Sequence, residues 1–213
     1  MTRTILAFGD SNTHGTKPMP DHAGAGRFDR AERWPGAMAD ALGDGWHLVE
    51  EGLPGRTAAW GDVLMGDHMN GQTGLKIALA SHAPIDVLVI VLGTNDVKAR
   101  LGLTAEGVAA GIAGLLDIAN DPDTQAAHAE FRTLLVCPPP ITEGPPFAAE
   151  MRGGAALSRA LPALLEPLAE AHGVAFLDAG RHIAVSPTDG VHFDADAHRT
   201  LGHAIARAID ALH

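Results

Sequence analysis

Several residue types are scarce in this sequence, and each scarcity excludes something. The single cysteine, Cys137, cannot form an internal disulfide, so we expect a cytoplasmic protein from a reducing compartment. The longest apolar run in the middle of the chain, residues 87–92, is far too short to cross a bilayer. The N-terminal residues lack the apolar stretch of a signal peptide. We therefore expect no membrane as a partner.

Basic residues are also few. The chain has 15 Lys and Arg against 26 Asp and Glu, which gives a formal net charge of -11 at pH 7. Proteins that bind nucleic acid need a basic surface, so nucleic acid is excluded as a partner and anionic substrates are disfavoured. Tyrosine is absent and aromatic residues make up 4%, whereas there are 25 glycines and 14 prolines. The glycines and prolines gather between apolar runs, which indicates tight turns at the ends of elements.

Short apolar runs recur along the 213 residues without any repeat or convincing domain boundary, so we expect a single domain over residues 1–213. The runs lack the apolar and polar alternation of half-exposed strands, which predicts strands buried on both faces of a parallel sheet. The predicted strands are residues 4–8, 47–50, 86–92, 133–137 and 175–178.

Two segments between or after these runs have apolar residues at helical spacing. One begins after Thr104, which is placed to cap it, and the other follows Asp194 or Asp196 as its cap. Their apolar positions are Val108, Ile112, Leu115, Leu116 and Ala119 in the first and Ala197, Leu201, Ile205 and Ala208 in the second. Strands that alternate with helices predict an α/β domain of three layers with right-handed crossovers.

A serine follows the first predicted strand, in Gly9-Asp10-Ser11-Asn12-Thr13. At the start of a helix, where free N–H groups favour an anion, Ser11 can be a nucleophile. Asp10 and Ser11 can equally serve as helix caps, and on this segment alone capping is favoured. The spacing does not fit a P-loop, a dinucleotide-binding motif or the nucleophile elbow of α/β-hydrolases.

A carboxylate and a histidine lie close together near the C-terminus, in Asp189-Gly190-Val191-His192. One loop can deliver both groups, with Asp189 accepting from one ring nitrogen of His192 while the other nitrogen faces Ser11. The alternative is an Asx turn in a surface loop, and with 12 histidines a chance pairing of this kind is common.

Two further strand ends offer donors for a developing oxyanion. Asn95 follows the third predicted strand, and Gly55 follows the second, where no side chain obstructs its backbone N–H. Each is an ordinary cap or turn residue when taken singly. All five positions, however, follow predicted strands or lie in C-terminal loops, so one edge of a parallel sheet can bring them together. The five are Ser11, Gly55, Asn95, Asp189 and His192.

In this order the segments resemble the motif blocks of the SGNH hydrolases, also called GDSL-type esterases. The blocks are Gly9-Asp10-Ser11, Gly55, Gly93-Thr94-Asn95-Asp96 and Asp189-Gly190-Val191-His192. The resemblance spans residues 5 to about 205 and implies a flavodoxin-like, three-layer α/β/α sandwich with a five-stranded parallel sheet. Further segments are similar to a bacterial subgroup of arylesterases and acyltransferases that act on small acyl groups: Glu51-Gly52-Leu53-Pro54-Gly55-Arg56-Thr57, Arg33-Trp34-Pro35 and Cys137-Pro138-Pro139-Pro140.

The resemblance implies a role for each matched residue. Ser11 would be the nucleophile, His192 the general base and then acid, and Asp189 the carboxylate that orients it. The oxyanion hole would consist of the backbone N–H groups of Ser11 and Gly55 and the side-chain amide of Asn95. The subgroup resemblance and the apolar, Pro-rich segment 138–147 also lead us to expect a homo-oligomer.

Other positions have plainer interpretations. Asn12 stands where the family motif has leucine, and we expect it to contact substrate together with Trp34 and Trp60, although core packing explains the two tryptophans equally well. We expect Asp10 and Asp96 to hold loops through backbone hydrogen bonds, and Cys137 to be a small buried residue. His198 and His203 are off the same-face spacing of a helix, and we expect no metal and no cofactor.

The expected function is that of a serine esterase that hydrolyses small carboxylic esters through an acyl-enzyme on Ser11, with an alcohol as a second possible acceptor of the acyl group. An enzymatic alternative keeps the same residues but acts on carbohydrate O-acetyl esters or thioesters. An alternative from another class is a flavodoxin-like module that binds phosphate in the segment 9–15 and catalyses nothing.

Overall fold

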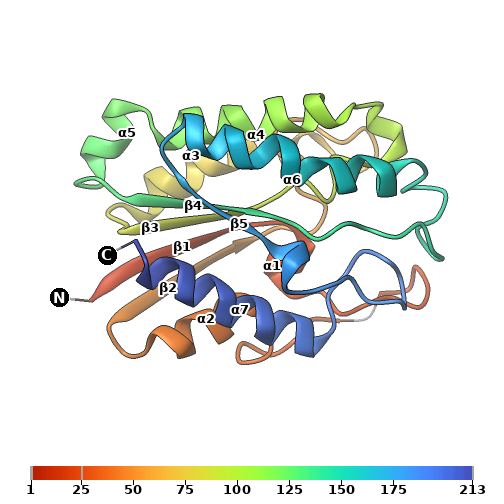
Figure 1. Ribbon diagram of the computed structural model, residues 1–213, viewed down its shortest axis with the longest axis horizontal. Coiled ribbons are helices and arrows are strands. Elements are labelled where there is room, and N and C mark those ends of the chain that lie inside the picture. Colours follow the sequence, from red (N-terminus) through yellow and green to blue (C-terminus); the bar gives the residue numbers. More distant parts are fainter. Residues whose placement is uncertain (1, 25, 213) are drawn as a thin grey trace.

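Five strands form one parallel sheet in the computed structural model, which describes residues 2–24 and 26–212 (Figure 1). The order across the sheet is β2-β1-β3-β4-β5. The strands are β1 (Arg3–Gly9), β2 (Trp46–Gly52), β3 (Val87–Val91), β4 (Arg132–Cys137) and β5 (Ala175–Asp178). The predicted fold class, an α/β sandwich with a five-stranded parallel sheet, is confirmed.

Every predicted strand overlaps an observed one, and 175–178 coincides with β5. The largest difference is in β2, which continues two residues beyond the predicted 47–50 at its carboxyl end. Glu51 and Gly52 are not apolar, but they pair with Phe8 and Gly9 of β1, so the backbone ladder extends past the apolar run.

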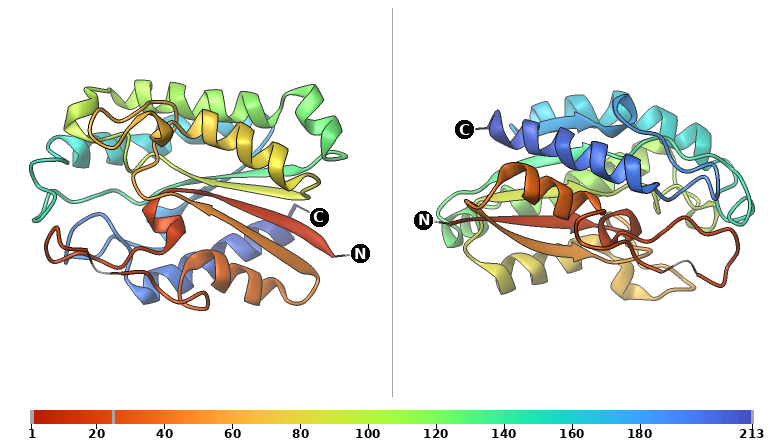
Figure 2. Two further views of the ribbon diagram at one scale, coloured as in Figure 1. Left: turned by 180° about the vertical axis from the view of Figure 1, so that it is seen from behind. Right: turned by 90° about the horizontal axis from the view of Figure 1, so that it is seen from below.

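Helices cover both faces of the sheet (Figures 1 and 2). One face carries α2 (Trp34–Leu42) and α7 (Ala195–Asp210), and the other carries α3 (Gly71–His82), α4 (Ala105–Ala119), α5 (Pro122–Ala127) and α6 (Gly154–Ala171). The shorter elements are α1 (Ser11–His14) and three single-turn 3-10 segments, Asp67–Met69, Ala99–Leu101 and Ala179–Arg181.

The two helix starts predicted from capping residues differ in detail. Thr104 caps α4 as expected, since its Oγ1 accepts a hydrogen bond from the backbone N–H of Gly107 over 3.1 Å. Helix α7 follows Asp194, but this side chain makes no capping hydrogen bond.

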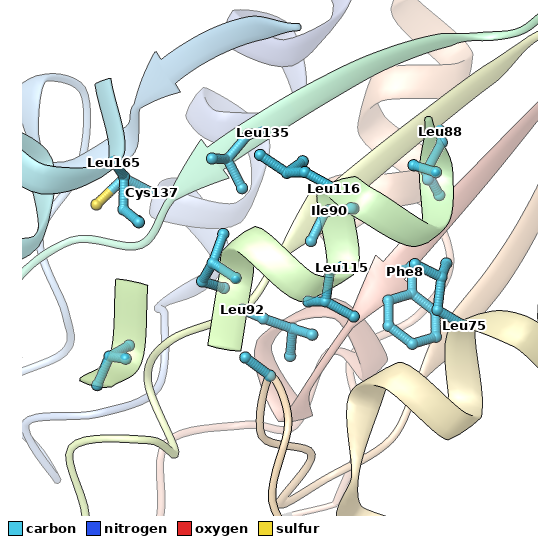
Figure 3. Packing of buried hydrophobic residues seen from close by; sticks show 14 of the residues in the cluster. Phe8, Leu75, Leu88, Ile90, Leu92, Leu115, Leu116, Leu135, Cys137 and Leu165 are labelled. Carbon is cyan, nitrogen blue, oxygen red and sulfur yellow. The ribbon is translucent and has the colours of Figure 1, made fainter. Parts of the chain in front are cut away.

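The sheet separates two apolar cores. Along β1, Leu6 and Phe8 pack toward α3, α4 and α6, whereas Ile5 and Ala7 pack toward α2 and α7. Figure 3 shows the first of these cores, where side chains from the strands interdigitate with those of the covering helices. Because both faces of each inner strand are buried, consecutive positions are apolar and no alternation is visible in the sequence. Each buried aliphatic side chain contributes about 1.5–3 kcal/mol.

The strand order places a crevice at the carboxyl end of β1. The chain passes from β1 to β2 on one side and then to β3 on the other, so the connections after β1 and β3 run away from each other and leave space between them. The carboxyl ends of the parallel strands lie at the same edge of the sheet, so the polar residues that follow β1 and β3 come together there. Across the described residues, no helix has both the length and the apolar character needed to cross a membrane.

Candidate active site

Three of the predicted residues form a hydrogen-bonded chain at this edge. Ser11 is the first residue of α1, directly after β1, and its Oγ lies 3.1 Å from His192 Nε2. His192 Nδ1 lies 2.7 Å from Asp189 Oδ2. A carboxylate only accepts, so Nδ1 carries the ring proton and Nε2 is left to accept from the serine hydroxyl. All three residues are buried, which keeps competing water away from these contacts.

The loop between β5 and α7 fixes the carboxylate and the imidazole relative to each other. Asp189 Oδ1 accepts hydrogen bonds from the backbone N–H groups of Val191 and His192, each over 2.9 Å. Gly190 has a φ of 74°, which L side chains rarely adopt, and a Cβ there would overlap Thr142. The turn therefore depends on glycine at this position.

A second loop also binds the Asp189 carboxylate. The backbone N–H of Met19 donates to Asp189 Oδ2 over 2.8 Å, and Met19 stands between two prolines that lack an N–H, Pro18 and Pro20. Burial raises the pKa of Asp189, but the hydrogen bonds from His192, Met19 and Val191 outweigh it and lower the pKa to about 2. The carboxylate is thus ionised at neutral pH. The sequence interpretation did not include Met19, although a lone residue between prolines is a visible signal.

Asn12 differs from its expected role as a substrate contact. Its Nδ2 donates to the carbonyl of Val191 over 3.2 Å, and the backbone N–H of Phe193 donates to its Oδ1 over 3.1 Å. Both amide atoms are used on the residues that flank His192, and Asn12 is fully buried. The side chain therefore ties α1 to the histidine loop and does not line the cavity.

The two tryptophans are also packing residues and not cavity walls. Trp34 begins α2 and is fully buried in the core between the sheet, α2 and α7, in the same apolar cluster as Leu201 and Ile205. Trp60 packs so closely on α4 that a Cβ on Gly111 would overlap its ring. Neither lines the cavity in the described part of the chain. Both rings pack between the helices and the sheet, which is the alternative that the sequence left equally open.

Gly55 and Asn95 line the same cavity as Ser11 and His192. Asn95 Nδ2 donates to the carbonyl of Arg56 over 3.0 Å and to Asp10 Oδ2 over 3.2 Å. Gly55 has a φ of 92°, and a Cβ there would lie 2.6 Å from the sulfur of Met65. Glycine at this position thus leaves the backbone close to the cavity and free of a side chain.

A buried arginine holds the loop that contains Gly55. Arg56 Nη1 donates to the carbonyl of Gly9 over 2.9 Å and to the carbonyl of Glu51, and its guanidinium carbon lies 4.1 Å from the centroid of the Phe8 ring. These contacts tie the carboxyl ends of β1 and β2 together. The sequence interpretation missed this role, because the positions that Arg56 bridges are far apart along the chain.

Two buried carboxylates stand next to the predicted catalytic positions, and both hold backbone as expected. Asp10 Oδ1 accepts from the N–H of Asn12 over 2.9 Å, and Asp96 Oδ1 accepts from the N–H of Ala58 over 2.8 Å. Burial raises the pKa of Asp10 to about 6 and that of Asp96 to about 7.

The cavity around Ser11 has a volume of about 200 Å³. Its apolar walls are Met19, Pro54, Met65, Phe147, Met151 and Val191, and its remaining polar residues are Thr16, Lys98 and Glu150. The Phe147 ring meets the His192 ring edge to face, with centroids 5.9 Å apart. Burial lowers the pKa of Lys98. Lys98, Glu150 and Phe147 were missed from sequence because they lie in loops with no recognisable motif.

Other candidate groups lie away from this site. Cys137 is buried at the end of β4, as expected, and burial raises the pKa of its thiol. His198 is buried beneath α2, where its Nδ1 accepts from the backbone N–H of Trp34 over 3.2 Å. Among the described residues, no group of three or more His, Cys, Asp or Glu side chains is arranged to hold a metal ion.

Comparison with known proteins identifies the class that this fold and site define. The model of the GDSL-like lipase/acylhydrolase family matches residues 7–200. The chain therefore belongs to this family and is a carboxylic ester hydrolase. A search of curated proteins found no match.

Three of the solved structures with similar folds are named as esterases. The chain is 38% identical to Est24, a carbohydrate acetylesterase from Sinorhizobium meliloti, with a TM-score of 0.94 and full coverage of both chains. It is 34% identical to an aryl esterase from M. smegmatis, again with a TM-score of 0.94 and full coverage of both chains. A carbohydrate acetylesterase family member from Sinorhizobium meliloti is 36% identical over 99% of each chain, with a TM-score of 0.91.

Proposed function

We propose that Ser11 attacks the carbonyl carbon of a small ester and becomes transiently acylated. His192 Nε2 takes the hydroxyl proton as the C–O bond to Ser11 forms, and it returns the proton to the alkoxide or phenolate that leaves. Water then gives a proton to His192 Nε2 and attacks the acyl carbonyl, and His192 passes this proton to Ser11 Oγ as the acyl–Oγ bond breaks and the acid is released. The observation that supports this sequence is the hydrogen-bonded chain from Ser11 Oγ through His192 to Asp189.

The oxyanion of each tetrahedral intermediate would be bound by the backbone N–H groups of Ser11 and Gly55 and by the amide of Asn95. The amide hydrogens of Asn95 are directed at Arg56 and Asp10, and the contact with Asp10 is the longer, at 3.2 Å. A full negative charge on the intermediate would compete with Asp10 for this hydrogen, while the bond to Arg56 keeps the amide in place.

The substrate would be a small, uncharged ester. A cavity of about 200 Å³ with apolar walls suits an acetyl group and a compact leaving group. The similar solved structures named above are an aryl esterase and a carbohydrate acetylesterase, and their names support a phenol and a sugar hydroxyl as the two kinds of leaving group. The formal net charge of -11 disfavours anionic esters.

Labelling by a fluorophosphonate tests the nucleophile. We expect one adduct per chain on the wild type, mapped to Ser11 by mass spectrometry, and no adduct on Ser11→Ala. If the wild type is not labelled and its melting temperature rises in phosphate, the non-catalytic phosphate-binding module is favoured.

The acyl acceptor and the substrate class need a separate comparison. We propose that an alcohol can replace water in the second step, so that transfer competes with hydrolysis. Turnover of aryl acetates, acetylated xylan and short acyl-CoA, each with and without an added alcohol, separates aryl esterase, carbohydrate esterase and thioesterase activity. A product ratio that an added alcohol leaves unchanged would argue against acyl transfer.

We also propose that the enzyme is a cytoplasmic homo-oligomer. Val63 and Leu64 are about four-fifths exposed in the loop beside the cavity, at 82% and 78%, which is unusual for apolar side chains on a free surface. The free thiol of Cys137 suits a reducing compartment. A monomeric mass in sedimentation, or recovery of the enzyme from the culture medium, would contradict these two points.

A further inference from the structure

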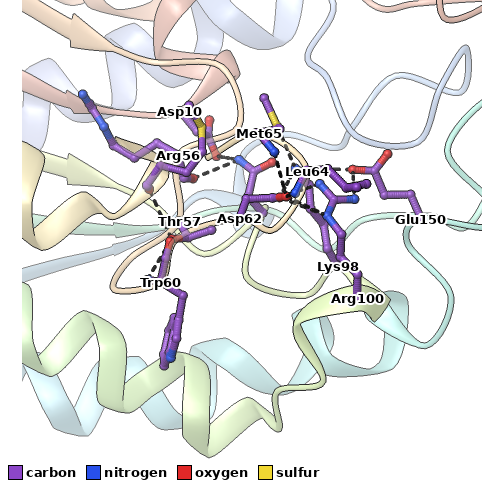
Figure 4. Close-up of polar contacts among 12 residues, drawn as sticks. Asp10, Arg56, Thr57, Trp60, Asp62, Leu64, Met65, Lys98, Arg100 and Glu150 are labelled. Carbon is purple, nitrogen blue, oxygen red and sulfur yellow. Dashed lines mark hydrogen bonds and ion pairs between the residues drawn. The ribbon is translucent and has the colours of Figure 1, made fainter. Parts of the chain in front are cut away.

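Four charged side chains from three loops form a cluster at one wall of the cavity (Figure 4). Asp62 comes from the loop after β2, Lys98 and Arg100 from the segment after β3, and Glu150 from the loop before α6. Arg100 binds Asp62 through Nε at 3.0 Å and Nη2 at 2.5 Å, and it binds Glu150 Oε1 through Nη1 at 2.7 Å. The two positive and two negative charges cancel.

Only part of this cluster reaches the cavity. Lys98 and Glu150 line it together with Ser11 and His192, whereas Asp62 and Arg100 do not line it in the described part of the chain. The side chain of Lys98 is 5% exposed, so its ammonium group is withdrawn from bulk water and faces the cavity. The ion pair thus forms a polar patch in a wall that is otherwise apolar.

This patch has unused hydrogen-bonding capacity. Lys98 Nζ carries three protons, and its nearest carboxylate oxygen among the described residues is Glu150 Oε1, at 3.3 Å. Asp62 Oδ2 is 3.9 Å away, and the sulfur of Met65, a weak acceptor, is 3.8 Å away. Glu150 uses Oε1 for both Lys98 and Arg100, and among the described residues no hydrogen bond falls on its Oε2. A spare donor and a spare acceptor therefore stand side by side.

We propose that Lys98 and Glu150 bind a free hydroxyl of the ester substrate, which accepts from Lys98 Nζ and donates to Glu150 Oε2. The preferred substrates would then be acetates of polyols or sugars, and this inference rests on the proposed ester hydrolysis at Ser11. A hydroxyl is the neutral group that donates and accepts at once. A plain alkyl group would leave the buried ammonium without its additional partner, and a carboxylate would face the charge of Glu150.

The cluster also joins loops, and this structural role must be separated from recognition. Arg100 makes most of the contacts that join the loops, because two of its nitrogens donate to Asp62. Asp62 Oδ1 in turn accepts from the backbone N–H groups of Leu64 and Met65 in its own loop. Arg100→Lys weakens the same cluster without changing a residue that lines the cavity. It is therefore the matched control.

The test uses two acetates with the same carbon skeleton, glycerol 1-acetate and n-propyl acetate, which differ by two hydroxyls. Acetate release is followed at constant pH, and the ratio of the two kcat/KM values is compared among variants.

Lys98→Met should lower the glycerol-to-propyl ratio about tenfold or more, the effect of losing a hydrogen bond to a charged group. Glu150→Gln keeps an oxygen for Lys98 and Arg100 but replaces the free acceptor with an amide, so the ratio should fall about threefold or more. Arg100→Lys should leave the ratio unchanged while lowering the melting temperature.

Two outcomes overturn the proposal that Lys98 and Glu150 bind a substrate hydroxyl. The first is a glycerol-to-propyl ratio that stays within twofold of wild type in both folded variants. The second is an equal fall of the ratio in Arg100→Lys, which would assign the effect to loop structure. If Lys98→Met does not fold, Glu150→Gln decides alone. A wild type that hydrolyses neither acetate overturns the proposed function itself, whereas a wild type that hydrolyses both with no change of ratio in the variants overturns only the role of Lys98 and Glu150.

Discussion

Asn95 Nδ2 donates a hydrogen bond to Asp10 Oδ2 over 3.2 Å, although the two residues are 85 positions apart. Asp10 follows β1 and Asn95 follows β3, on the two sides of the switch point of the sheet. Both are buried. We propose that this carboxylate, next to the proposed nucleophile, helps to position the Asn95 amide until the oxyanion takes over the hydrogen bond.

The first prediction concerns this pair. Asp10→Asn keeps an oxygen that can accept from the N–H of Asn12, but its second atom becomes a donor that faces the donor of Asn95. We expect kcat to fall about 10–100-fold with little change in KM, because the amide is displaced from the transition state more than from the bound ester. Steady-state kinetics with p-nitrophenyl acetate measure this.

A double-variant cycle is the control for the Asp10 prediction. Asn95→Ala removes the donor and should cost about 10²–10³ in kcat. If Asp10 acts through Asn95, Asp10→Asn in the Asn95→Ala background should cost almost nothing more. Fully additive losses would show that Asp10 acts by another route.

The second prediction concerns stability and pH. The pKa of Asp96 is raised from 3.8 to about 7 in the folded chain, so between these values the folded chain holds a proton that the unfolded chain has lost. The contribution of Asp96 to stability therefore falls as the pH rises from about 4 to 7 and is at its lowest above pH 7. Asp96→Asn keeps an acceptor for the N–H of Ala58 and cannot ionise, so its advantage over wild type should grow by roughly 3 kcal/mol between pH 5 and pH 8.

Comparison of variant and wild type is needed because other groups titrate in the same range. Burial lowers the pKa of His198 from 6.5 to about 3, which makes its contribution rise with pH between these values, opposite in sign to that of Asp96. The difference between Asp96→Asn and wild type cancels this contribution. Urea unfolding at both pH values measures it, and a difference that does not change with pH would show that Asp96 is ionised throughout.

The third prediction concerns the loop that binds Asp189. Met19→Pro removes the N–H that donates to Asp189 Oδ2 over 2.8 Å, whereas Met19→Leu keeps it and preserves an apolar side chain in the cavity. We expect kcat/KM for p-nitrophenyl acetate to fall about tenfold in Met19→Pro, in line with one hydrogen bond to a charged group, and to stay within about threefold in Met19→Leu. Equal losses in the two variants would mean that the side chain of Met19 matters and its N–H does not.

The fourth prediction concerns the length of the acyl chain. The cavity of about 200 Å³ is bounded by Met65, which lies against Gly55. We expect kcat/KM to decrease from p-nitrophenyl acetate to butyrate to octanoate, and we expect Met65→Ala to improve butyrate relative to acetate by removing part of the wall. Octanoate turned over as fast as acetate would show that acyl chains do not enter this cavity.

The sheet could be predicted from sequence because its strands are buried on both faces. The run 87–92 is entirely apolar, and β3 lies within it as Val87–Val91. Helix α6 shows the opposite case, since Pro162 and Pro167 lie inside it and interrupt the pattern by which a helix is recognised. The positions of Ser11, Asp189 and His192 follow from strand ends, which is why motifs along the chain pointed to one edge.

The polar surroundings of the site could not be predicted in the same way. Lys98 and Glu150 meet only because two loops pack together, and no periodicity fixes the path of a loop. Asn12, Trp34 and Trp60 were expected to contact substrate, with core packing equally open for the two tryptophans, and their side chains contact the histidine loop and the two cores. Asn12 follows Ser11 in α1, where consecutive side chains point in different directions around the helix axis, so its place next to Ser11 in the sequence does not bring it to the cavity.

Turnover of p-nitrophenyl acetate by Ser11→Ala shows whether Ser11 carries the acyl group. Ser11 is 6% exposed, and alanine removes only its hydroxyl, so the variant should fold with an unchanged circular dichroism spectrum. We predict a loss of at least about 10³-fold in kcat/KM, since the variant retains only the oxyanion donors and the binding cavity. A folded Ser11→Ala variant with activity within tenfold of wild type would contradict it.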